Sequence, residues 1–179
     1  MTERKVLSIT GFAAYIETWT PRPLFDRGMV SDHLSTAEVS VRDDSGNKQE
    51  TGFLISEVLV KAFEALRAAW GGPLDVTSGF RTPEKQAALI GSNPNAAKYS
   101  PHQEGMALDI NADGPGMVDK LVGILRDLRA EFPLRIGWKE YRAKGFHFVH
   151  MDVCPFYYGA DGPWAGRDCP DAWRNVSEW

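Results

Sequence analysis

Two short apolar segments of the chain each contain a single carboxylate, and this limits the folds that the chain can adopt. Asp109 lies in the run MALDIN and Asp152 lies in the run FVHMDV. Burying a carboxylate is costly unless the group is paired, hydrogen-bonded or bound to a metal. We therefore expect two buried strands whose carboxylates each meet a partner.

Histidines accompany these carboxylates. His102 lies in a loop that runs through a glycine into the strand of Asp109, and His147 and His150 lie in or next to the second segment. Imidazole and carboxylate groups form a ligand set that suits Zn²⁺, and a catalytic zinc typically takes three protein ligands and keeps one position open. His102, Asp109 and one of the later histidines would form such a set if the two strands are neighbours.

Simpler interpretations of these residues remain open. Asp109 would also be explained as the buried partner of Arg81, and the two later histidines as a hydrogen-bonded pair in the core. Asp152 is expected to be a structural carboxylate rather than a ligand. His150, Asp152 and Cys154 alternate along the strand and share one face, which makes the cysteine a competing ligand.

The hydrophobic pattern predicts an α+β fold. Apolar residues at steps of three and four predict long helices over residues 54–70 and 117–132, and Thr82-Pro83 is typical of the start of a short helix. A hairpin fits between residues 39–41 and 51–53. Four strands are predicted, over residues 74–78, 106–111, 134–138 and 146–153. This order favours a small, mostly antiparallel sheet with helices packed on one face.

Length and charge narrow the class of protein. The 179 residues favour a single domain over residues 1–179, with a core at about residues 54–153 and wrapping extensions at residues 1–50 and 154–179. No apolar run approaches the roughly 20 residues of a membrane-spanning helix. The net charge is −4, without a basic stripe. We expect a monomer that neither inserts into membranes nor binds nucleic acid, in which Cys154 and Cys169 form one disulfide or remain thiols.

Three segments of the sequence indicate a particular protein family more specifically as an ordered set than they do singly. They are SGFR at residues 78–81, SPHQEGMALD at residues 100–109 and FVHMD at residues 148–152. This ordered set resembles the zinc D-Ala-D-Ala carboxypeptidase family, the peptidoglycan peptidases of the Hedgehog/D-Ala-D-Ala-peptidase fold. The family pattern is Ser-Gly-(aromatic)-Arg, then Ser-x-His-x-x-Gly-x-Ala-x-Asp, then a late strand ending in x-x-His, and the middle motif matches at every fixed position.

The resemblance implies roles for five residues. His102, Asp109 and His150 would bind one Zn²⁺ per chain. Arg81 would hold a substrate carboxylate or polarise the scissile carbonyl, a task that suits a planar guanidinium. Ser100 would help to position the substrate near the metal.

The general base is the point at which the chain departs from the family pattern. The family usually has an acid three residues before the last zinc ligand, and here that position is His147. A neutral imidazole can take a proton from water and pass it to the leaving amine. Because residues three apart in a regular strand face opposite sides, His147 needs a bulge or a strand start just after it. Glu104 is the alternative base.

The resemblance thus implies a zinc metallopeptidase that cuts the bacterial peptidoglycan stem peptide. The reaction would be that of a D-Ala-D-Ala carboxypeptidase or of an endopeptidase at L-Ala-D-Glu or within a cross-bridge. The alternatives are a non-catalytic, zinc-containing cell-wall-binding module and a phage structural module. Since the N-terminus lacks the apolar core of a secretory signal, we expect a cytoplasmic protein released late, like a phage endolysin, or one exported by another route.

Overall fold

The structure is a computed structural model that describes residues 22–24, 28–42, 48–49, 53–92, 100–138 and 145–153. Cys154 and Cys169 lie outside these residues, and so does nearly all of the two predicted extensions outside residues 28–42. Among the residues described, no helix is long and apolar enough to cross a membrane.

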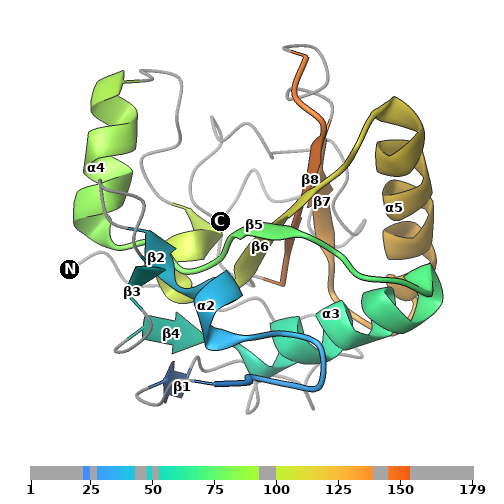
Figure 1. The fold of residues 1–179 in the computed structure, drawn as a ribbon, viewed down its shortest axis with the longest axis horizontal. Helices are drawn as coiled ribbons and strands as arrows, with labels where there is room; N and C mark the ends of the chain where they lie inside the picture. Colours follow the sequence, from blue (N-terminus) through green and yellow to red (C-terminus); the bar gives the residue numbers. More distant parts are fainter. Residues whose placement is uncertain are drawn as a thin grey trace, which may run out of the picture.

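A four-stranded antiparallel sheet lies at the centre of the fold (Figure 1). Its strands in spatial order are β5 (Val76–Ser78), β6 (Ala107–Asn111), β8 (Phe148–Asp152) and β7 (Arg135–Gly137). The two strands that carry the carboxylates, β6 and β8, are the central pair. The predicted α+β class and the required proximity of these strands are both confirmed.

The register of β6 and β8 separates apolar from polar residues. Leu108 pairs with Met151 and Ile110 with Val149, and all four side chains are buried in the core. The alternate positions point to the opposite face, because successive side chains of a strand alternate. On that face, Asp109 lies directly opposite His150, and Ala107 lies opposite Asp152.

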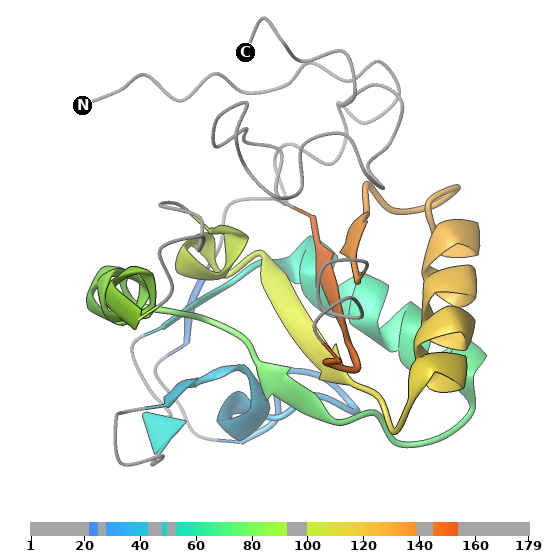
Figure 2. The same ribbon diagram turned by 90° about the horizontal axis from the view of Figure 1, so that it is seen from above.

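Two long helices cover the apolar face of the sheet. The helices α3 (Glu57–Trp70) and α5 (Pro115–Leu128) contact each other and supply much of the core (Figure 2). The buried side chains of α3 and α5 include Leu59, Phe63, Leu66, Leu121 and Leu125. A third helix, α4 (Pro83–Ser92), follows β5 and lies at the opposite end of the molecule from α5 in both views.

Five short elements precede α3. Strand β1 (Arg22–Leu24) pairs with β4 (Phe53–Ile55), helix α2 (Thr36–Val39) follows, and β2 (Val41–Arg42) pairs with β3 (Lys48–Gln49). The hairpin is confirmed, but its strands lie at residues 41–42 and 48–49 instead of 39–41 and 51–53, because Val39 belongs to α2.

The predicted limits were wrong at the start of α3 and at both ends of α5. Leu54 and Ile55 belong to β4, because the side chain of Ser56 caps α3 by accepting a hydrogen bond from the Leu59 amide at 3.5 Å. The apolar periodicity simply continues from a buried strand into the helix. Helix α5 begins at Pro115, a residue suited to a first turn, and ends at Leu128 rather than at residue 132.

Candidate metal centre

A tight turn before β6 positions His102. The 3-10 helix η1 (Pro101–Glu104) is capped by Ser100, whose hydroxyl accepts a hydrogen bond from the His102 amide at 3.4 Å. Gly105 ends the turn with φ +66°, and a Cβ at this position would overlap the backbone of Leu54. The glycine therefore lets the turn pack against β4 and directs the His102 ring, which is buried, over the start of β6.

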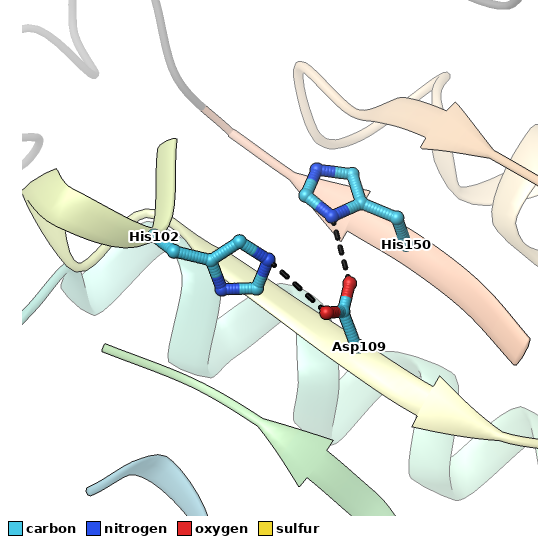
Figure 3. A group of neighbouring side chains, drawn as sticks. All are labelled: His102, Asp109 and His150. Atoms are coloured by element: carbon cyan, nitrogen blue, oxygen red, sulfur yellow. Dashed lines mark hydrogen bonds and ion pairs between the residues drawn. The ribbon is translucent and has the colours of Figure 1, made fainter. Parts of the chain in front are cut away.

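The three metal-ligand candidates meet on the polar face of the sheet (Figure 3). Asp109 Oδ1 lies 2.8 Å from His150 Nδ1, and Asp109 Oδ2 lies 3.3 Å from His102 Nε2. One ligand atom from each residue lies within 4.8 Å of the others. The Asp109 side chain keeps 14% exposure, whereas the side chains of His102 and His150 are each 3% exposed.

Hydrogen bonds determine which nitrogen of His102 carries a proton. Its Nδ1 lies 2.6 Å from the carbonyl oxygen of Gly79, which can only accept, so Nδ1 must donate. In the neutral ring Nε2 then bears a lone pair, and this lone pair faces the carboxylate oxygen of Asp109 at 3.3 Å. Two acceptors at this distance repel each other unless a cation lies between them.

The pKa values describe the charges of the cluster in the metal-free chain. Burial lowers the pKa of His102, which favours the neutral ring. Burial alone would raise the pKa of Asp109, but the two histidines hold it well below its usual range, so the carboxylate is ionised. Burial alone would lower the pKa of His150, but hydrogen bonds to Asp109 and Asp152 and their negative charge raise it to about 9.

The donor set fits zinc. Two imidazoles and one carboxylate are the ligands that Zn²⁺ accepts in catalytic sites. The outer nitrogen of each ring is also hydrogen-bonded, His102 Nδ1 to the Gly79 carbonyl and His150 Nε2 to Asp152 Oδ2 at 3.1 Å. Such outer hydrogen bonds are the usual companions of metal-ligating histidines, since they fix the ring orientation.

Comparison with known proteins identifies the family. The sequence profile of the family described as peptidoglycan L,D-endopeptidase MepK matches residues 22–157. The chain belongs to this family. It is therefore a peptidoglycan peptidase, as the three motifs indicated, and the non-catalytic alternatives are set aside. No curated protein sequence matches the chain.

Three solved structures show limited similarity to the chain. Serratia marcescens L-Ala D-Glu endopeptidase ChiX is 15% identical, with a TM-score of 0.46 over 56% of this chain and 80% of ChiX. The vancomycin resistance D,D-pentapeptidase VanY from a VanB-type cassette, in complex with Zn(II), is 19% identical, with a TM-score of 0.37 over 74% of this chain and 86% of VanY. VanYB in complex with D-alanine-D-alanine is also 19% identical, with a TM-score of 0.37 over 75% and 86% of the two chains.

Arg81 lies beside the cluster in this peptidoglycan peptidase. Its Nη2 is 4.0 Å from Asp109 Oδ2, and its Nη1 donates to the buried Gln86 Oε1 at 2.8 Å. The simpler interpretation, in which Asp109 is a partner of Arg81, is therefore correct in part, because Asp109 contacts both histidines as well. Ser100 is buried and supports the η1 turn, and its role toward a substrate stays a prediction.

The two candidate bases lie outside the three-residue cluster. Strand β8 begins at Phe148, so the strand start that His147 requires lies directly after it. The backbone carbonyl of His147 accepts a hydrogen bond from Ala112 at 2.9 Å, while its buried Nδ1 has no hydrogen-bond partner among the described residues. Glu104 is the last residue of η1.

Two supporting groups were missed by sequence reasoning. The Gly79 carbonyl binds His102, and no side-chain pattern reveals a backbone acceptor. Arg135 binds Asp152 Oδ1 through its Nε at 2.8 Å. A signal for this second contact existed, because Arg135 is the only charged residue in the predicted strand 134–138 and a buried carboxylate needs a partner.

Proposed function

We propose that the chain is a zinc-dependent endopeptidase that hydrolyses a bond between an L- and a D-residue of the peptidoglycan stem peptide. One Zn²⁺ per chain would be held by His102, Asp109 and His150. The observation that carries the proposal is the opposition of two acceptors, His102 Nε2 and Asp109 Oδ2, at 3.3 Å. The family description as an L,D-endopeptidase favours an L,D bond over D-Ala-D-Ala.

Residues around the cluster would position the substrate. A zinc ion supplies Lewis acidity, which activates water and polarises a carbonyl. Arg81 would bind a substrate carboxylate or the oxygen that gains negative charge, because its guanidinium already lies next to Asp109 and is held by Gln86. Ser100 would fix the turn that carries His102 and contribute to the substrate-facing side.

His147 would transfer the proton. Its imidazole would accept a proton from water and return it to the leaving amine, and the buried Nδ1 has no hydrogen-bond partner among the described residues that would compete for this proton. Because the substrate is part of the cell wall, we propose that the protein acts there after release or export.

Cleavage of defined peptides tests the function. Zinc-loaded chain is incubated with purified peptidoglycan and with synthetic stem peptides that contain either an L-Ala-D-Glu bond, an L,D cross-bridge or a terminal D-Ala-D-Ala. Products are identified by mass spectrometry. We expect cleavage at an L,D bond and intact D-Ala-D-Ala ends. Release of terminal D-Ala alone would replace the proposal with a carboxypeptidase, and uncut substrates would refute it.

Substitution of the two candidate bases tests the proton transfer. We expect His147→Ala to lower kcat by about 10²–10⁴-fold, the usual contribution of a general base, with unchanged zinc content. Glu104→Gln is the matched comparison and should retain most of the rate. The opposite pattern would assign the base to Glu104.

A further inference from the structure

A chain of hydrogen bonds continues from His150 away from Asp109. His150 Nε2 lies 3.1 Å from Asp152 Oδ2, and Asp152 Oδ1 accepts from Arg135 Nε at 2.8 Å. The Asp152 side chain is 0% exposed and that of Arg135 is 12% exposed. A fully buried carboxylate is costly unless it is satisfied, and here both of its oxygens are engaged by residues of the sheet.

The register of the sheet fixes this arrangement. In the antiparallel pair β7 and β8, Arg135 lies opposite Asp152 and Gly137 lies opposite His150. Residues opposite each other or two apart along a strand share a face, so Arg135, Asp152 and His150 form a row on the polar side. Gly137 has no side chain, so nothing projects from β7 at the position opposite His150.

We propose that Asp152 and Arg135 are positioning residues that fix the tautomer of His150 and thereby set the affinity for the metal. The inference rests on the proposed function, since it takes His150 to be a ligand. A guanidinium can only donate, so Arg135 Nε donates to Asp152 Oδ1, while Asp152 Oδ2 lies 3.1 Å from His150 Nε2. A carboxylate can only accept, so Nε2 of His150 keeps its proton toward Asp152. In the metal-free chain Nδ1 also donates to Asp109 Oδ1 at 2.8 Å, and it is this Nδ1 proton that a metal would displace to bind the Nδ1 lone pair.

The ring of His102 is fixed in the opposite tautomer. Its Nδ1 donates to the Gly79 carbonyl, so its Nε2 faces Asp109. The two histidines therefore present different nitrogens to one carboxylate. The backbone fixes one ring, whereas the other depends on two side chains that mutagenesis can change separately.

Replacement of the carboxylate by an amide provides the first test. A carboxylate has two accepting oxygens, whereas an amide has one accepting oxygen and one donating nitrogen. The asparagine of Asp152→Asn therefore cannot accept hydrogen bonds from Arg135 and His150 on two separate oxygens, as the aspartate does. If its oxygen stays on Arg135, its NH₂ group faces His150 Nε2 and favours the tautomer that cannot bind metal through Nδ1. We expect the zinc dissociation constant, measured by chelator competition, to rise by about 10–100-fold.

The matched control is Asp75→Asn. Asp75 accepts a hydrogen bond from the Asn111 side chain at 3.1 Å on the other edge of the same sheet, at an exposed position. This control should bind zinc like the wild type. An unchanged zinc dissociation constant in Asp152→Asn, with wild-type zinc binding, would overturn the inference and leave the proposed function standing. A wild type that binds no zinc would instead refute the proposed function.

A double variant separates positioning from simple loss of structure. The variant Asp152→Asn with Arg135→Met has no guanidinium at position 135 to donate to the amide oxygen. This oxygen is then able to turn toward His150. We expect the double variant to bind zinc more tightly than Asp152→Asn alone. A purely structural role predicts the reverse, because a second buried substitution would add to the damage, and that result would contradict the inference.

A measurement on the unmodified chain avoids any folding defect of the variants. Long-range ¹H–¹⁵N spectra of the zinc-loaded protein, labelled at histidine, report the protonated nitrogen of each ring. We expect opposite tautomers, with the proton on Nε2 of His150 and on Nδ1 of His102. A His150 ring protonated on Nδ1 would overturn the inference.

Discussion

Asp109 has an unusual set of neighbours for one carboxylate. Its two oxygens contact His102 and His150, and the Arg81 guanidinium lies 4.0 Å away. In the metal-free chain this charge, together with that of Asp152, holds a proton on His150. A metal ion that binds Nδ1 must displace this proton, so metal affinity and protonation are linked at this residue.

The stability of the metal-free chain should fall as pH rises from about 6.5 to 9. The pKa of His150 is raised from 6.5 to about 9 in the folded chain, so its contribution is complete below 6.5 and is lost as pH rises through 9. His102, whose pKa is lowered from 6.5, is neutral in the folded chain throughout this window, and it is neutral in the unfolded chain as well once the pH is about one unit above 6.5. Chemical denaturation of chelator-treated protein measures the slope. The variant His150→Gln should lack this slope, and an equal slope in both proteins would contradict the assignment.

At the level of elements, the site depends on how η1 enters β6. Gly105 joins them with a left-handed conformation, and its amide and carbonyl bond to His102 and Ser56 respectively. The turn therefore connects the candidate metal centre to the start of α3. A small change in this turn would move His102 relative to Asp109, although neither residue is altered.

Gly105→Ala tests this connection. Its Cβ would overlap the Leu54 backbone, and a positive φ costs a non-glycine residue about 1–2 kcal/mol before any overlap. We expect a loss of more than about 2 kcal/mol in the free energy of unfolding, measured by urea denaturation, together with weaker zinc binding. Gly123→Ala is the control, since this exposed position in α5 has no atom within 4 Å of a new Cβ and alanine favours helix. Equal stabilities of the two variants would refute the role of the turn.

The predictability of the elements follows their length and pattern. Strands β6 and β8 could be predicted because their short apolar segments each enclose a single carboxylate, and α3 and α5 could be predicted because their periodicity extends over several turns. The β1/β4 pair was missed, since strands of three residues show no period of their own. The three ligand candidates came from motif spacing, whereas the Gly79 carbonyl and the pairing of Arg135 with Asp152 needed the strand register.

Across the whole molecule, the core residues and the candidate site residues lie on opposite faces of the central sheet. One face packs on α3 and α5 and forms the core, while the other face carries His150, Asp109 and Asp152. The ligand candidates come from η1, β6 and β8, so a metal ion would connect three segments that are distant in sequence. Such an ion should stabilise the fold, because it binds the native state and finds no preformed site in the unfolded chain.

Thermal unfolding measures this coupling. At free zinc about 1,000 times the dissociation constant, the stabilisation should be about 4 kcal/mol, with a corresponding rise in Tm. The rise should disappear in His102→Ala, which lacks one ligand candidate. An equal rise in that variant would show that zinc acts elsewhere on the chain.

The metal content of the purified protein tests the central claim most directly. Elemental analysis is applied to the wild type, to Asp109→Ala and to the control Asp75→Ala after zinc reconstitution and removal of free metal. The account requires close to one zinc per chain in the wild type and the control, and almost none in Asp109→Ala. A wild type without zinc, or an Asp109→Ala variant that retains it, would contradict the assignment of His102, Asp109 and His150 as the metal site.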